Sequence, residues 1–379
     1  MTGLPSTAPE PGRILDLARR DKAAASQALA ELSIESQVAL VCEAPTARRQ
    51  ELLSLVPFPE KVIPRIPEGE LCFTIKAIGL ADAPWLLAYA TPEQIVACID
   101  LDGWSGLEPD HEAMDAWIDA LAETGAEPFI RSALALDSEV MVLYLGQRIQ
   151  VVQKPDEKEG WDPPEGAQTL DGQFYFTARG EDDDVAAIVK LLNGLFTQDY
   201  WVYFRMMQAA IWELDSSTEE WALRWRTGRL EDMGFPPWDE AISVYRFMDV
   251  EERAAIPEGE QPLNVAEWHL PLWLPQLPTG ADSTALIFQT IPLLEDSERR
   301  SAFYAFVAVA NKIAVADRMK LSDAEFAPRA IEKAARFISD GLALIASAHG
   351  IEAVEVLRRV SLERLFRVGA NLDPEQARM

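Results

Sequence analysis

The stretch from Thr197 to Phe247 decides the fold, and it reads TQDYWVYFRMMQAAIWELDSSTEEWALRWRTGRLEDMGFPPWDEAISVYRF. It holds five of the eleven tryptophans of the chain together with a tight group of arginines. Long apolar segments separated by polar, glycine and proline breaks are typical of consecutive helices. We therefore expect three helices here, and a mainly α fold around them.

The first two helices are predicted from their capping residues. Thr197 can accept an orphan backbone N–H through its side-chain oxygen, which predicts a helix from Thr197 to Trp212. Ser217 is followed by Glu220 three positions later, which is the spacing of a capping box. This spacing predicts a second helix over about Thr218–Met233.

The third helix follows a glycine and two prolines. Gly234 suits the left-handed position just past a helix end. Pro236 and Pro237 cannot continue a helix, but a proline can open the next one. We expect that helix over roughly Trp238–Phe247.

Two tryptophans and three arginines of the second helix form the candidate site. Trp221 and Trp225 lie four positions apart and share a face, which we expect to be core. Arg224, Arg226 and Arg229 fall on the flanks and are the candidate surface for an acidic or phosphorylated partner. The alternative is that these arginines form internal ion pairs with Glu219, Glu220, Glu231 and Asp232.

The first part of the chain contains many short, closely joined helical segments. Helical patterns cover the four segments from Ile14, from Ala23 to Leu32, from Ser33 to Cys42 and from Ala47 to Val56. Thr91-Pro92-Glu93 begins a further helix with a capping residue, a proline and an acid. We expect stacked, superhelical or repeat-like helical hairpins, a few short extended segments, and a C-terminal helical layer.

Two segments about one hundred residues apart resemble each other. Residues 69–77 read GELCFTIKA and residues 172–180 read GQFYFTARG. Both precede a threonine helix start, which suggests an old duplication; chance similarity between short apolar segments explains the match equally well.

Composition shifts divide the chain into six predicted parts. They are a flexible tail over 1–12, an N-terminal helical unit over 13–153, a linker or exposed loop over 154–171, a second helical unit with an aromatic core over 172–255, a proline-rich connection over 256–282 and a C-terminal helical layer over 283–379.

The charge balance narrows the classes of partner. With 62 acidic and 34 basic residues the formal net charge is −28, which repels nucleic acids and anionic membranes and favours cationic partners. No apolar run reaches the length that crosses a bilayer, so we expect no membrane insertion. Cys42, Cys72 and Cys98 are odd in number and form no CxxC pair, which favours a reducing cytoplasm over a disulfide framework or a zinc site.

Motifs for cofactors and catalysis are missing from the sequence. There is no GxGxxG, no GxxxxGK[ST] and no GxSxG. Asp100-Leu101-Asp102-Gly103 opens like a calcium loop, but Glu108 and Asp110 do not occupy the later ligand positions. We therefore predict no cofactor and no metal.

Three motifs carry a resemblance to a known family. FTIKAIGLADA at 73–83, WRTGRLEDMGFPPWDEA at 225–241 and SLERLFRVG at 361–369 resemble an uncharacterised bacterial family, domain of unknown function 6178, over nearly the whole chain. That family implies no activity and no catalytic residues. Residues 13–100 also resemble the N-terminal superhelical domains of magnesium-transporter regulators and of the flagellar motor switch protein, which implies a regulatory or assembly role.

The sequence favours a binding protein over an enzyme. We expect a cytoplasmic helical scaffold or regulatory adaptor that binds another protein; its oligomeric state stays open. The alternative is a metal- or carboxylate-dependent enzyme in which acidic residues converge from separate helices.

Overall fold

The structure is a computed structural model, and it describes residues 10–155, 160–179, 186–213, 215–257 and 284–372. Helices make up 71% of it, which confirms the prediction of a mainly α fold. Contacts divide the chain into two compact units, Met1–Arg226 and Thr227–Met379. The first compact unit contains the predicted N-terminal helical unit and the part of the predicted second helical unit that precedes residue 227. The domain boundaries predicted from the sequence stay predictions.

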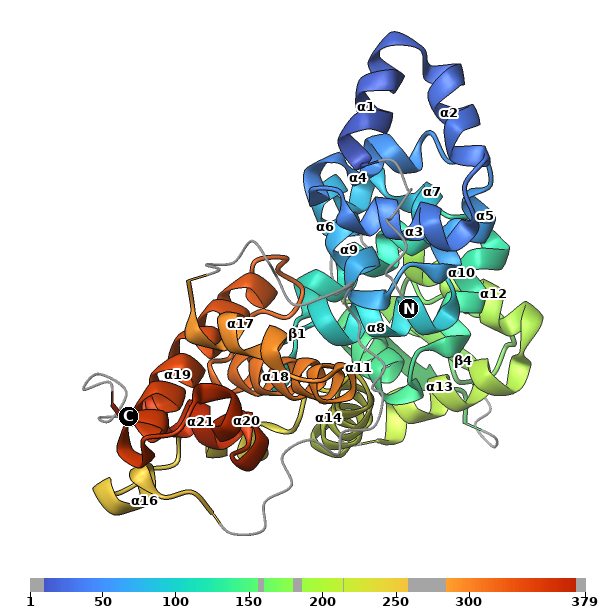
Figure 1. Cartoon of the computed structure of the whole chain (residues 1–379). Helices are drawn as coiled ribbons and strands as arrows, with labels where there is room; N and C mark the ends of the chain where they lie inside the picture. The colour runs from blue at the N-terminus through green and yellow to red at the C-terminus, as the bar shows by residue number, and fades with distance from the viewer. Residues whose placement is uncertain (1–9, 156–159, 180–185, 214, 258–283, 373–379) are drawn as a thin grey trace. The chain divides into compact units, whose positions relative to one another are not determined.

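Unit 1 consists of short helices and two small antiparallel sheets (Figure 1). Its elements are α1 Pro11–Arg20, α2 Lys22–Ala30, α3 Ile34–Glu43, α4 Thr46–Leu53, α5 Pro59–Val62, η1 Ile63–Arg65, α6 Glu68–Ile78, η2 Leu80–Asp82, α7 Pro84–Leu87, α8 Pro92–Asp102, β1 Trp104–Ser105, β2 Glu108–Pro109, α9 His111–Ala122, α10 Ala126–Ala135, α11 Ser138–Arg148, β3 Ile149–Gln153, β4 Phe174–Ala178, α12 Ala186–Gln198, α13 Tyr200–Trp212 and the first part of α14 Asp215–Asp232.

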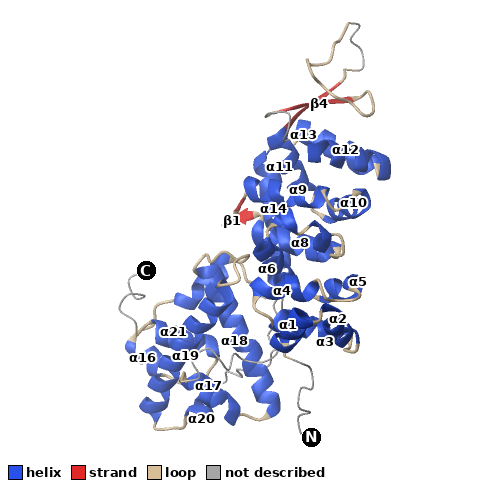
Figure 2. Cartoon of the chain, turned by 90° about the horizontal axis from the view of Figure 1, so that it is seen from above, coloured by secondary structure: helices blue, strands red, loops and turns tan. Residues whose placement is uncertain are grey.

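Alternate helices of unit 1 pack on one another. Helix α4 contacts α6, α6 contacts α8, α8 contacts α10, and α10 contacts α12. Figure 2 shows this row of helices along the unit. On the other side of the row, α11 packs against α13. A short helix cannot bury its apolar face alone, so each helix of the row buries that face against its neighbours.

Two of the predicted helix starts in this part of the chain, at Ser33 and Thr91, are confirmed. The Ser33 side chain accepts a hydrogen bond from the backbone N–H of Ser36. Thr91 and Gln94 form a complete capping box at the start of α8. Helix α1 begins at Pro11, where a proline fits the first helical turn.

Two buried carboxylates hold the α4, α6 and α8 layer together. The Arg49 guanidinium forms an ion pair with Glu70 at 2.6 Å and also donates to the carbonyl oxygen of Cys42. Asp102 accepts from Lys76 Nζ at 2.8 Å and from Trp117 Nε1 at 2.9 Å. Buried charges persist in proteins when they are paired in this way.

The resemblance between residues 69–77 and 172–180 does not extend to structure. The first segment lies in the helix α6, and the second contains the strand β4, which pairs with β3 so that Val151 opposes Phe176. Lys76 binds a carboxylate, whereas Arg179 donates to the carbonyl oxygen of Ile149. The neighbouring strand therefore decides the conformation of the second segment, and the two segments are not structural equivalents.

The organising stretch has different helix boundaries from those predicted. Thr197 lies in the last turn of α12 and donates to the carbonyl oxygen of Asn193, so it does not cap a helix. Asp199 instead caps α13 by accepting from the backbone N–H groups of Trp201 and Val202. Helix α14 begins at Asp215, which places Ser217 inside it and removes the predicted capping box.

The end of the stretch follows the prediction more closely. Gly234 has a φ of 86°, as expected for the residue after a helix. Helix α15 starts at Trp238 as predicted, but it ends at Ala241 and continues as a 3₁₀ helix to Tyr245.

Unit 2 contains the longest helices of the described chain. Its elements are the end of α14, then α15 Trp238–Ala241, η4 Ile242–Tyr245, α16 Val250–Ala254, α17 Leu286–Thr290, η5 Ile291–Leu293, α18 Asp296–Ala316, α19 Phe326–His349, α20 Ala353–Arg359 and α21 Leu362–Ala370. The core forms where α19 packs against both α18 and α21.

Helix α19 buries an apolar stripe along one face. Ile331, Ala335, Ile338, Leu342 and Ile345 are all buried. Helix α20 ends at Arg359, and the Ser361 side chain caps a separate helix, α21. The proline-rich connection lies outside the described residues except for its first two positions.

Candidate functional site

The three candidate arginines do not form one surface. Arg224 is exposed, and its guanidinium lies 5.0 Å from the ring centroid of Trp221. Arg226 is only 9% exposed, and Arg229 is half-buried. Residues two apart on a helix point about 200° apart, so Arg224 and Arg226 lie on opposite sides of α14.

Arg226 is a structural residue of unit 1. Its Nε donates to the carbonyl oxygen of Asp100 at 2.8 Å, and its Nη1 donates to the carbonyl oxygen of Gly106 at 3.3 Å. The guanidinium also lies 5.0 Å from the ring centroid of Trp104. Its placement on an accessible flank is therefore wrong, because the last turn of α8 and the β1–β2 turn surround it.

The expectation that the tryptophans of α14 are core residues is also wrong. Trp221 and Trp225 are 44% and 47% exposed, and their rings stack with centroids 6.1 Å apart. The buried face of α14 instead contains Thr218, Ala222 and Arg226, which are spaced four residues apart. A prediction from hydrophobicity alone therefore places the wrong face of α14 in the core, because two polar side chains, Thr218 and Arg226, occupy its buried face.

Helix α13 presents a second exposed aromatic face. Trp201 and Trp212 are 68% and 71% exposed. Arg205 and Gln208 lie between them at spacings of four and three residues, so the four side chains share one face of the helix. The opposite face is buried through Tyr203 and two methionines.

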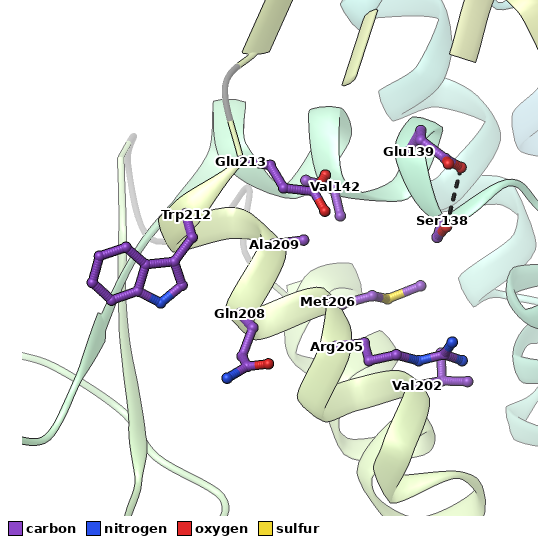
Figure 3. A pocket seen from close by; sticks show the side chains of 10 residues that line it. All are labelled: Ser138, Glu139, Val142, Val202, Arg205, Met206, Gln208, Ala209, Trp212 and Glu213. Atoms are coloured by element: carbon purple, nitrogen blue, oxygen red, sulfur yellow. Dashed lines mark hydrogen bonds between the residues drawn. The ribbon is translucent and has the colours of Figure 1, made fainter. Parts of the chain in front are cut away.

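A groove lies between α11 and α13, beside this face (Figure 3). Its volume is about 500 Å³. We call it the α11–α13 groove; its lining residues are Ser138, Glu139, Val142, Val202, Arg205, Met206, Gln208, Ala209, Trp212 and Glu213. A space of this size accommodates one or two side chains of a partner, or a small molecule.

Charged groups surround the groove. Glu139 comes from the first turn of α11 and accepts a hydrogen bond from the Ser138 hydroxyl at 3.0 Å. Glu213 follows the last residue of α13 and accepts from the Thr218 hydroxyl at 3.3 Å. Arg205 is exposed and forms no ion pair within the described residues.

Apolar side chains form the remainder of the groove wall. Val142 comes from α11, while Val202, Met206 and Ala209 come from α13. Figure 3 shows that the carboxylate of Glu213 points toward Val142, whereas the ring of Trp212 turns outward. The arrangement can therefore hold an apolar side chain and pair with charged groups at its rim.

The structure gives no support to a metal centre in the part of the chain that it describes. No group of three or more histidine, cysteine, aspartate or glutamate side chains there is arranged to hold a metal ion. Asp100 and Asp102, which resemble the opening of a calcium loop, are buried in the last turn of α8. Among the described residues no single helix is long and apolar enough to cross a bilayer, although α19 and α20 pass that test as a pair bent by 102°.

The sequence contained a signal for the α13 face. Arg205 and Gln208 are polar side chains in an otherwise apolar helix, and both share a face with Trp201 and Trp212. Two polar residues on one stripe indicate an exposed face, and the tryptophans must then be exposed with them. The convergence of Glu139 and Glu213 has no such signal, since it depends on the packing of α11 against α13.

A family model described as a family of unknown function, DUF6178, matches residues 26–375. No curated protein and no solved structure matches the chain.

Proposed function

The chain belongs to the family of unknown function DUF6178. Membership in this family implies no activity, so we propose from the geometry that the chain is a helical scaffold or adaptor. In this proposal the α11–α13 groove holds a segment of another protein. The exposed α13 face is the observation that carries the proposal. Burying two tryptophans that are 68% and 71% exposed on one helix would remove a large apolar area from water.

The composition of the face supports protein binding. Tryptophan and arginine are the residues that most often dominate the binding free energy of protein interfaces, and Trp201, Arg205 and Trp212 occur here within three helical turns. The groove beside them offers a pocket for an anchoring side chain. An exposed apolar patch with a polar rim is typical of an interaction surface.

The architecture of unit 1 supports the same role. Its alternate helices pack in a row, an arrangement that helical-repeat proteins use to build extended binding surfaces. We propose that unit 1 is such a helical repeat. The weaker resemblance of residues 13–100 to superhelical regulatory domains stays a prediction.

We propose a cytoplasmic location for the protein. Cys42, Cys72 and Cys98 are free and buried, and free thiols are retained in a reducing compartment.

The enzymatic alternative uses the same groove, because Glu139 and Glu213 reach it from separate elements. General acid–base carboxylates are usually tuned by burial, but Glu213 is exposed to solvent. We therefore favour binding over catalysis.

Site-specific photocrosslinking tests the proposed function. A photoreactive phenylalanine analogue replaces Gln208 in the groove, or Phe247, which is 70% exposed in unit 2. We expect a discrete crosslinked partner from position 208, and we expect Trp212→Ala to abolish that adduct. Identical adducts from both positions, or none from position 208, would contradict the proposal.

A further inference from the structure

The α11–α13 groove also indicates the chemistry of its partner. We propose that the groove holds a basic segment of a partner protein, in which one lysine or arginine pairs with Glu213 and a second packs against the outward-turned ring of Trp212. This inference rests on the proposed function, and it adds the charge and the position of the recognised side chain.

Three sources of negative potential meet at the C-terminal end of α13. The last carbonyl groups of a helix carry a partial negative charge, which favours cations. Glu213 adds a full negative charge at the same end, and its carboxylate points into the groove (Figure 3). The face of the Trp212 indole adds the negative part of its quadrupole.

The chain itself shows how its tryptophans bind cations. Guanidinium groups lie 5.0 Å from the ring of Trp221, 5.0 Å from that of Trp104 and 5.1 Å from that of Trp238. Within the described residues Trp212 has no such cation. Its exposed ring is therefore available for a lysine or arginine from another molecule.

The remaining charges of the groove specify an orientation. Glu139 is a second carboxylate on the α11 side, and it gives the groove a net negative charge against the single cation of Arg205. Arg205 lies about two turns before Glu213 on α13, so it repels a cation placed near it. We infer that the lysine or arginine of the partner lies at the Glu213 end, and that a neutral or acidic residue lies beside Arg205.

The field of the whole chain favours the same partner. A net charge of −28 accelerates the approach of a cationic segment and repels anionic ones. It also opposes binding of the exposed tryptophans to an anionic membrane. A basic protein segment is therefore favoured over a lipid surface.

Binding of two matched peptides to the full chain tests this inference. The probes are a fluorescein-labelled amphipathic peptide with leucines on one face and lysines on the other, and the same peptide with glutamates in place of the lysines. Fluorescence anisotropy measures the affinity of each peptide for the wild-type chain and for Glu213→Gln, Arg205→Glu and Glu127→Gln. The last is the control, because Glu127 is an exposed carboxylate on α10 outside the groove.

We expect the lysine peptide to bind and the glutamate peptide not to bind. Glu213→Gln should weaken the lysine peptide about two- to fivefold, as expected for loss of one solvent-accessible ion pair, and Arg205→Glu should strengthen it by a similar factor. Glu127→Gln removes the same charge elsewhere, so it should leave the affinity unchanged. General attraction to an acidic chain would instead give equal effects for Glu213→Gln and Glu127→Gln, and would overturn the inference.

Three other results would also overturn the inference, and they separate it from the proposed function. Tighter binding of the glutamate peptide, lost in Trp212→Ala but not in Phe247→Ala, would leave the groove as a protein-binding site with the opposite charge preference. Sedimentation with phosphatidylglycerol vesicles that depends on Trp212 would assign the face to lipid. If neither peptide binds and position 208 gives no crosslinked partner, the proposed protein-binding function of the groove is itself contradicted.

Discussion

The guanidinium of Arg226 in α14 donates a hydrogen bond to the carbonyl oxygen of Asp100 in α8 at 2.8 Å. Asp100 lies in the last turn of α8, where the backbone carbonyl oxygens receive no hydrogen bond from an N–H group of the same helix. Arg226 therefore caps the end of α8 from a distant part of the sequence. A second hydrogen bond, to the carbonyl oxygen of Gly106, fixes the β1–β2 turn to the same side chain.

Removing this cap should destabilise the protein. We expect Arg226→Ala to lower the free energy of unfolding by about 2–3 kcal/mol, because buried carbonyl groups lose their donors. Arg224→Ala on the same helix removes only an exposed contact with Trp221 and should cost less than about 1 kcal/mol. Urea unfolding followed by circular dichroism measures both. Equal losses in the free energy of unfolding for Arg226→Ala and Arg224→Ala would show that Arg226 is not the structural residue of the pair.

The exposed tryptophans should contribute little to stability. Trp212 is 71% exposed, so we expect Trp212→Ala to change the free energy of unfolding by less than about 0.5 kcal/mol. Trp117 is fully buried and donates to Asp102, so Trp117→Ala should cost about 3–5 kcal/mol. Thermal unfolding compares the two variants. A large loss for Trp212→Ala would place that side chain in the core.

Two glycines allow α19 and α21 to pack closely. A Cβ atom on Gly341 would lie 2.0 Å from the carbonyl oxygen of Leu365, and one on Gly369 would lie 1.9 Å from that of Phe337. Either alanine variant forces the helix backbones apart, so we expect each to cost about 3 kcal/mol. Gly228 in α14 has no atom within 4 Å of that position, so Gly228→Ala should stabilise by about 0.5–1 kcal/mol. Denaturant midpoints that move in the same direction for all three variants would contradict this account.

Alkaline pH should weaken the fold through Cys42. Burial, with a further contribution from Glu70, raises the pKa of this thiol from 9.0 to about 12. Between these values the unfolded chain has lost the proton and the folded chain retains it. The stabilisation is therefore complete below pH 9.0, and the free energy of unfolding falls by about 1.4 kcal/mol per pH unit between 9.0 and about 12 because of this one group. Cys42→Ala should show a shallower decline in urea titrations across this range, and an unchanged slope would rule the thiol out.

Much of the fold could be predicted because its signals are local. The capping residues Ser33 and Thr91 begin helices where expected, and the apolar spacing from Ile331 to Ile345 marks the buried face of α19. Long-range pairing has no such local signal. The segment that contains β4 has the same Phe-Thr pair as α6, yet it forms a strand because β3 lies beside it.

The candidate site was harder to predict, because buried polar residues reverse the usual patterns. Arg226 belongs to the interior through hydrogen bonds to Asp100 and Gly106, two residues more than a hundred positions earlier in the chain. Sequence spacing cannot show those acceptors, so hydrophobicity places the exposed Trp221 and Trp225 in the core instead. Only the α13 face carried its own signal, in the polar Arg205 and Gln208.

Hydrogen–deuterium exchange of the full chain tests the central claim, that the α11–α13 groove is the binding site, most directly. The exchange of backbone amides is compared with and without the lysine-faced amphipathic peptide. We predict slower exchange in residues 138–142 and 202–213, and no such protection in the Trp212→Ala variant. Protection elsewhere in the chain, or protection of these residues that survives Trp212→Ala, would contradict the claim.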